Sequence, residues 1–84
     1  MKSEAQASIE HEVAELRGDY PRVTSCQSAL RTWMEDGMPR HSLWLDIRWP
    51  QHQSIVSGPA RGTADAAVRA ALEQAVRVLE QSHA

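Results

Sequence analysis

The stretch SLWLDIRW, residues 42–49, decides the fold because its side chains alternate in character along the chain. One set of alternate positions holds Leu43, Leu45, Ile47 and Trp49. The other set holds Trp44, Asp46 and Arg48. Successive side chains of a strand point to opposite faces, so this pattern predicts a strand with one buried and one outward face.

Two further strands are predicted beside it. Residues 22–33 are rich in Val, Thr, Ser, Cys and Trp and lack a helical stripe, which favours a strand. The segment MEDGMPRH, residues 34–41, gathers Gly, Pro and charge, and we predict a loop there. Pro50 ends the central strand, residues 50–53 turn the chain, and residues 54–58 form a short third strand.

Helices are predicted at both ends of the chain. Ser3 followed by Gln6 fits a capping box, and an apolar stripe continues through Ile9, Val13 and Leu16. Gly18 is the expected helix stop, where a positive φ is common. In the second helix Thr63 is the expected N-cap. Its predicted buried stripe is Val68, Leu72, Ala75 and Leu79, with Ala71 and Val76 at the margins.

These elements predict an α+β fold in the order helix, strand, strand, strand, helix. The connections are short enough for antiparallel pairing, and two amphipathic helices can cover one face of a three-stranded sheet. With 84 residues the chain has room for one hydrophobic core, so residues 1–84 are expected to form a single domain.

Composition and charge reduce the number of functions that are expected for this chain. The net charge is −2 and no segment is a basic block, which counts against strong binding to polyanions. The first 16 residues carry four Glu, unlike a secretory signal, and no run reaches membrane-spanning length. We therefore expect a cytoplasmic protein that has no membrane association.

The residues that could carry chemistry favour a protein that is not an enzyme. Cys26 is the only cysteine, and a small buried apolar role is more common for such a residue than a reactive thiol with a lowered pKa. His11, His41, His52 and His83 lack zinc-type spacing. Glu35 and Asp36 read as solvated turn charges. We expect no catalytic residues, no metal site and no cofactor.

Trp44 is the residue most suggestive of binding, because the predicted strand turns it away from the helices. Three interpretations remain, in descending order: an anchor in a protein interface, simple cross-strand packing, and stacking on a nucleobase. Arg31 and Arg48 are grouped with Trp44 as interface candidates.

Three segments in register resemble a known family. They are RVTSC at residues 22–26, IRWPQH at residues 47–52, and the helix from residue 67 to residue 80. Together they resemble the ribosome hibernation-promoting factors, also called ribosome-associated inhibitors or sigma-54 modulation proteins. The similarity covers nearly the whole chain.

The resemblance implies both a fold and a function. The family fold is strand, helix, three strands, helix, and its layout is related to that of double-stranded RNA-binding domains. Family members bind the small ribosomal subunit near the decoding site and inhibit translation in resting or stressed cells. By resemblance, Arg22, Arg69 and Arg77 are the rRNA-binding candidates in this chain.

The chain departs from the family in ways that suggest an alternative. It begins at the first helix, so the family's first strand has no counterpart, and residues 23–32 are expected to form an open sheet edge. Open edges invite pairing with another chain, which predicts a homodimer through this edge or the Trp44 face. The first helix is also acidic. The alternative function is a diverged relative without RNA binding that serves as a protein-interaction or homodimerisation module.

Overall fold

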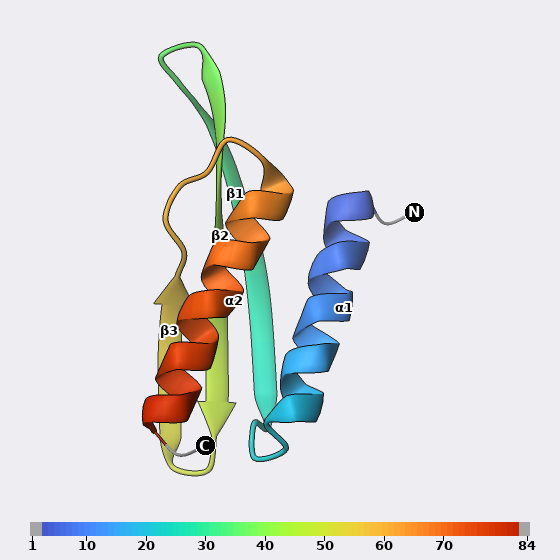
Figure 1. Cartoon of the computed structure of the whole chain (residues 1–84), viewed down its shortest axis with the longest axis vertical. Coiled ribbons are helices and arrows are strands. Elements are labelled where there is room, and N and C mark those ends of the chain that lie inside the picture. The colour runs from blue at the N-terminus through green and yellow to red at the C-terminus, as the bar shows by residue number, and fades with distance from the viewer. Residues whose placement is uncertain (1–2, 83–84) are drawn as a thin grey trace.

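The computed structural model describes residues 3–82 and confirms the predicted order of elements. The elements are α1 (Glu4–Asp19), β1 (Ser25–Glu35), β2 (Met38–Trp49), β3 (His52–Ser57) and α2 (Ala64–Gln81). The strands form one antiparallel sheet in the order β1-β2-β3, and both helices lie on the same side of it (Figure 1). The molecule is therefore an α+β protein with one covered and one open sheet face. Within residues 3–82, no helix has the length and apolar character needed to cross a membrane.

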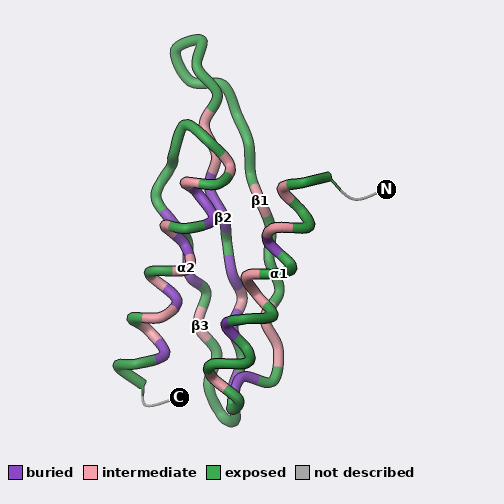
Figure 2. Tube along the Cα trace, turned by 45° about the vertical axis from the view of Figure 1, so that its right-hand side comes forward, coloured by how far each residue is buried: buried purple, intermediate pink, exposed green. Residues whose placement is uncertain are grey.

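The inward face of β2 is the centre of the core. Leu43, Leu45 and Ile47 are completely buried, and Trp49 is nearly so (Figure 2). Against this face α2 places mostly small residues: Ala67, Val68, Ala71, Ala75 and Leu79. A Cβ atom added to Gly58 would come within 3.0 Å of Ala71, so the backbone just after β3 is in close contact with α2 there. Small side chains allow α2 to pack tightly on the sheet.

Helix α1 buries fewer side chains in the core than α2. Its N-terminus is capped as predicted, because the Ser3 hydroxyl accepts a hydrogen bond from the Gln6 amide at 3.1 Å. Ile9 and Leu16 are buried, but Val13 between them is only half-buried. The helix lies alongside β1, at the margin of the sheet (Figure 1). This position leaves the β1 side of the core thinly covered.

The predicted loop at residues 34–41 is wrong, because the chain continues there as a hairpin. Met34 pairs with Pro39 and Glu35 with Met38, and only two residues make the turn. Asp36 has φ 52° and Gly37 has φ 77°, the left-handed values that a two-residue Asp-Gly turn requires. The hairpin tip therefore projects beyond the helices (Figure 1).

Other boundaries also differ from the prediction. The first strand begins at Ser25, which places Arg22 in the turn after α1, and the third begins at His52 because two residues suffice for the turn before it. Gly18 does not have a positive φ; it lies inside α1, and the Tyr20 amide donates to the Leu16 carbonyl to end the helix. On α2, Leu72 is only half-buried, whereas Ala71 is fully buried. The helix is thus rotated slightly from the predicted stripe.

Two isoleucines provide a matched test of this arrangement. Ile47 faces the helices and is fully buried, whereas Ile55 of β3 is 63% exposed on the other face. Ile47→Ala should lower the free energy of unfolding by about 2–5 kcal/mol because it leaves a cavity, and Ile55→Ala by about 1 kcal/mol or less. Urea denaturation followed by circular dichroism measures both. Equal losses would contradict the assignment of the two faces.

Candidate binding surface

The open face of the sheet brings together the three interface candidates, Trp44, Arg31 and Arg48. Trp44 is 38% exposed, and the guanidinium carbon of Arg31 lies 4.9 Å from the centre of its ring. This is a cation–π contact, which holds the arginine over the aromatic surface. Arg48 lies on the same face because it is four residues from Trp44 in β2.

The hairpin adds two residues to this surface that were not predicted from the sequence. Trp33 and Arg40 are directly paired between β1 and β2, and strand alternation places both on the face of Arg31 and Trp44. Trp33 is 38% exposed, and its indole donates to the Glu35 carboxylate at 3.3 Å. The dipeptide Asp36–Gly37 is the sequence feature from which this hairpin could have been predicted. We name the set formed by Arg31, Trp33, Arg40, Trp44 and Arg48 the outer face.

One acidic residue in the middle of the sheet is already engaged. Gln53 donates to Asp46 at 3.0 Å, and Arg48 contacts its other carboxylate oxygen at 3.3 Å. The hydrogen bond from Gln53, followed by the interactions with Arg48, lowers the pKa of Asp46. Arg31 and Arg40 form no ion pair among residues 3–82. Arg31 and Arg40 of the outer face thus lie beside exposed aromatic rings without an ion pair, whereas the charge of Arg48 is offset by Asp46.

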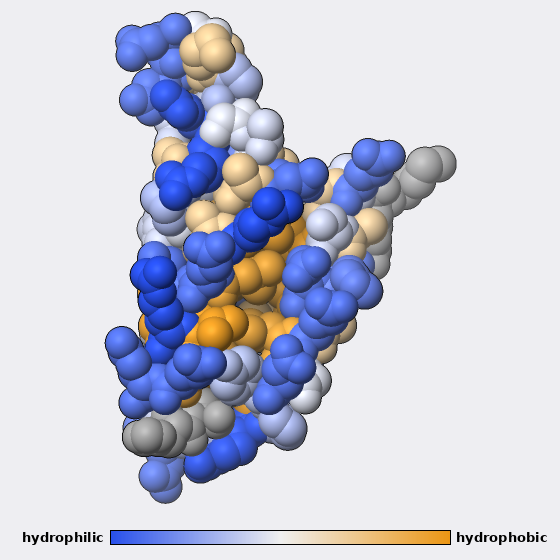
Figure 3. Space-filling model, in the orientation of Figure 1, coloured by the Kyte–Doolittle hydropathy of each residue, from blue (hydrophilic) through white to orange (hydrophobic). Residues whose placement is uncertain are grey.

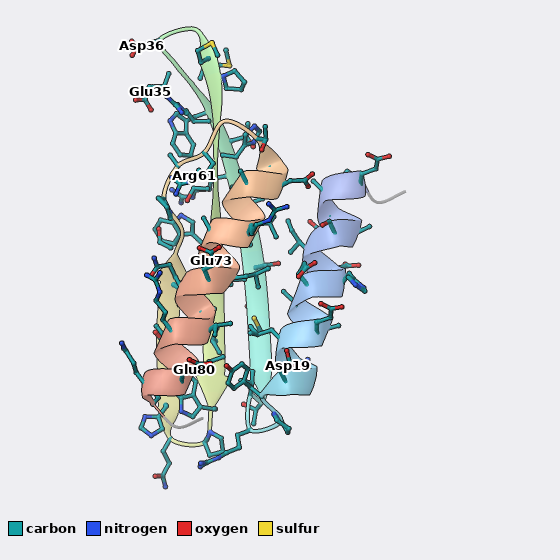
Figure 4. All side chains as sticks on the ribbon, in the orientation of Figure 1. Asp19, Glu35, Asp36, Arg61, Glu73 and Glu80 are labelled. Carbon is teal, nitrogen blue, oxygen red and sulfur yellow. The ribbon has the colours of Figure 1, made fainter. Side chains whose placement is uncertain are left out.

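The rRNA-binding candidates Arg22, Arg69 and Arg77 do not form a comparable patch. Arg69 and Arg77 border a shallow apolar hollow between the helices, whose centre is orange in Figure 3. Glu73 lies between them on α2 (Figure 4), and Glu12 of α1 borders the same hollow. Arg22 lies apart in the turn after α1. On this side of the molecule, each arginine of α2 has an acidic neighbour.

Cys26 lies on β1, on the side that faces α1, and is half-buried. Burial raises the pKa of its thiol, while nearby Arg17 acts in the opposite direction and is the weaker influence. A thiol with a raised pKa is a poor nucleophile at neutral pH. The geometry therefore agrees with a packing role, although the residue is less buried than a core side chain because α1 covers β1 only partly.

The histidines lie in three separate environments. His41 shares a 3.0 Å hydrogen bond with Thr32, and the His52 ring stacks on Trp49 at 5.4 Å. On α1, ligand atoms of His11, Glu12 and Glu15 lie within 4.8 Å of one another, and this is the set that could hold a metal ion within the described residues. Its His11–Glu15 contact of 3.1 Å joins two exposed side chains one helical turn apart. His83 lies outside the described residues.

Thiol labelling tests the environment of Cys26. Because the thiolate reacts, a raised pKa should slow labelling of the folded protein at pH 8 relative to the urea-unfolded chain. The folded rate should still be rising at pH values where the unfolded rate has levelled off. Absorbance of a released aromatic thiol measures both rates. Faster labelling in the folded state would indicate a reactive cysteine.

Comparison of the chain with protein-family models, with curated proteins and with solved structures found no match. A function for the chain is therefore inferred from its own residues and geometry.

Proposed function

We propose that the protein is a non-enzymatic, cytoplasmic RNA-binding protein that associates with the small ribosomal subunit and inhibits translation in resting or stressed cells. Two lines of support meet in this proposal. The sequence resembles the hibernation-promoting factors in three segments, and the chain has the helix, three-strand, helix order with both helices on one side of the sheet.

The outer face is the observation that carries the proposal. Exposed tryptophans provide flat surfaces on which unpaired bases stack, and this contact tolerates any base. Arg31, Arg40 and Arg48 lie among them, where guanidinium groups can contact phosphates or stack on bases. The combination of aromatic rings and arginines on an open sheet is a common way for proteins to bind single-stranded RNA.

The charge distribution suggests how the protein would be oriented on RNA. The exposed surface of α1 carries Glu4, Glu10 and Glu15, which would repel phosphates. The outer face lies on the opposite side of the sheet, so the two charge regions are separated. RNA would thus meet the sheet rather than the helices, with Arg22, Arg69 and Arg77 as additional phosphate contacts at most.

A second function is favoured by the apolar part of the open face. Ile55 is 63% exposed, and Trp44 lines the same shallow hollow. An aromatic and an aliphatic side chain exposed together can anchor a protein partner. Under this alternative the chain is a protein-interaction module without RNA binding.

Ribosome co-sedimentation at low salt distinguishes these functions. The wild-type protein should appear in the 30S and 70S fractions, and Trp44→Ala should weaken that association about tenfold or more through lost stacking. The double variant Arg31→Ala/Arg40→Ala should weaken it and reduce its salt dependence, since fewer counterions would be released.

The double variant Arg69→Ala/Arg77→Ala is the matched control, because it removes the same charge from the helical side. It should have the smaller effect. A larger effect would assign the contact to α2, as the family resemblance implies, and not to the outer face. Absence of the wild-type protein from both ribosomal fractions would overturn the proposal and favour the second function. Ribosome association that Trp44→Ala does not weaken would contradict the assignment of the RNA contact to the outer face.

A further inference from the structure

Strand β1 forms an open edge of the sheet, and a groove runs beside it. The sheet order leaves the outer side of β1 without a neighbouring strand among the described residues. Next to it lies a groove of about 510 Å³, lined on the helix side by Val13, Ala14 and Arg17 and on the strand side by Cys26 and Ser28. Helix α1 stands over the space that one more strand would occupy.

The backbone at this edge is suited to pairing. His41 exchanges hydrogen bonds with Arg61 on the β3 side of the sheet, which directs the even-numbered residues of β2 toward β1. Through the β1–β2 register, the odd-numbered residues of β1 then face β2, and Cys26, Ser28, Leu30, Thr32 and Met34 direct their amides and carbonyls outward. A row of backbone amides and carbonyls without a neighbouring strand can form hydrogen bonds with the strand of another chain.

The position of α1 limits which strand can fit. The groove shows that α1 accompanies β1 near Cys26 and Ser28, whereas the end of β1 toward Glu35 projects past the helices (Figure 1). If two copies pair antiparallel about Leu30, the middle of β1, the projecting end of each strand enters the groove of the other. The two α1 helices then lie at opposite ends of the joint.

In this register, side chains of the two copies that lie opposite each other are compatible on both faces of the sheet. Met34 is 66% exposed, and the partner's Met34 would lie opposite Cys26, where Val13 and Ala14 offer apolar surface. On the other face the partner's Glu35 would lie opposite Ser25, whose neighbour in β2 is Arg48. Cross-strand pairs of this kind stabilise sheets, and no like charges face each other.

We propose that two copies of the chain associate through antiparallel β1–β1 pairing centred on Leu30, with the hairpin of each copy seated beneath α1 of the other. The result is a continuous six-stranded sheet with a dyad at its middle. This inference is independent of ribosome binding, although the dimer would present two outer faces side by side.

The opposite edge of the sheet is a poorer choice for pairing. Strand β3 has six residues against eleven in β1, and prolines stand just outside both of its ends, at Pro50 and Pro59. Short edges flanked by proline resist the addition of strands. Strand β1 contains no proline and only two charged residues, Arg31 and Glu35.

A single substitution makes the register testable by cross-linking. Met34→Cys creates one new thiol, which in the dimer lies opposite the partner's Cys26 at a separation that a disulfide can span. Within one chain the two residues are eight positions apart along the same strand, too far to bridge. Mild oxidation of this variant should give a covalent dimer on a non-reducing gel.

Trp33→Cys is the matched control, because its side chain lies on the other face, and it should yield markedly less covalent dimer. Sedimentation velocity of the wild-type protein should show dimer increasing with concentration. Ser28→Pro removes an outward amide and should shift the protein to monomer while circular dichroism remains unchanged. A wild-type protein that stays monomeric at high micromolar concentration, or equal cross-linking of both cysteine variants, would overturn the proposal.

Discussion

The structure depends on the burial of one face of β2 beneath α2. Leu43, Leu45 and Ile47 lose all contact with water in this interface, and each contributes about 1.5–3 kcal/mol relative to exposure. Alanines of α2 and the close approach at Gly58 make that contact possible. In a chain of 84 residues this is a large part of the available core, and the hairpins on either side of β2 are positioned by it.

Placing both helices on one side has two consequences. The other side of the sheet is left uncovered, so most residues that β2 turns away from the core are available to solvent or to a partner, whereas Ser42 is buried against Gly58. Helix α1 also reaches past β1, which leaves an edge and a groove together. The proposed RNA surface and the proposed dimer interface are therefore products of the same packing, one on the open face and the other on the open edge.

Much of the fold follows from sequence patterns that are local. The alternation in residues 42–49 identified the inward and outward faces of β2, and Ser3 and Thr63 were recognised as helix caps. The prediction of a loop at residues 34–41 was wrong because Pro39 and the nearby charges suggested that the strand was interrupted there. The two-residue turn Asp36–Gly37 in fact joins β1 directly to β2, and Pro39 is tolerated near the tip of the hairpin.

The site was less predictable than the fold. The outward direction of Trp44 could be inferred from alternation, but its contact with Arg31 depends on the pairing register, which no local pattern fixes. Trp33 and Arg40 were missed because their pairing required the hairpin. The half-burial of Cys26 depends on how far α1 reaches across the sheet, and this is a tertiary property.

Hydrogen exchange of individual backbone amides tests the central claim most directly. Residues 44–48 of β2 pair with strands on both sides and lie beneath α2, so their amides and those of the α2 core should exchange only through global unfolding. The outward amides of Ser28 and Leu30 should exchange much faster in dilute solution and slow down as the concentration rises. Exchange of the β2 amides as rapid as that of the hairpin tip would contradict the account.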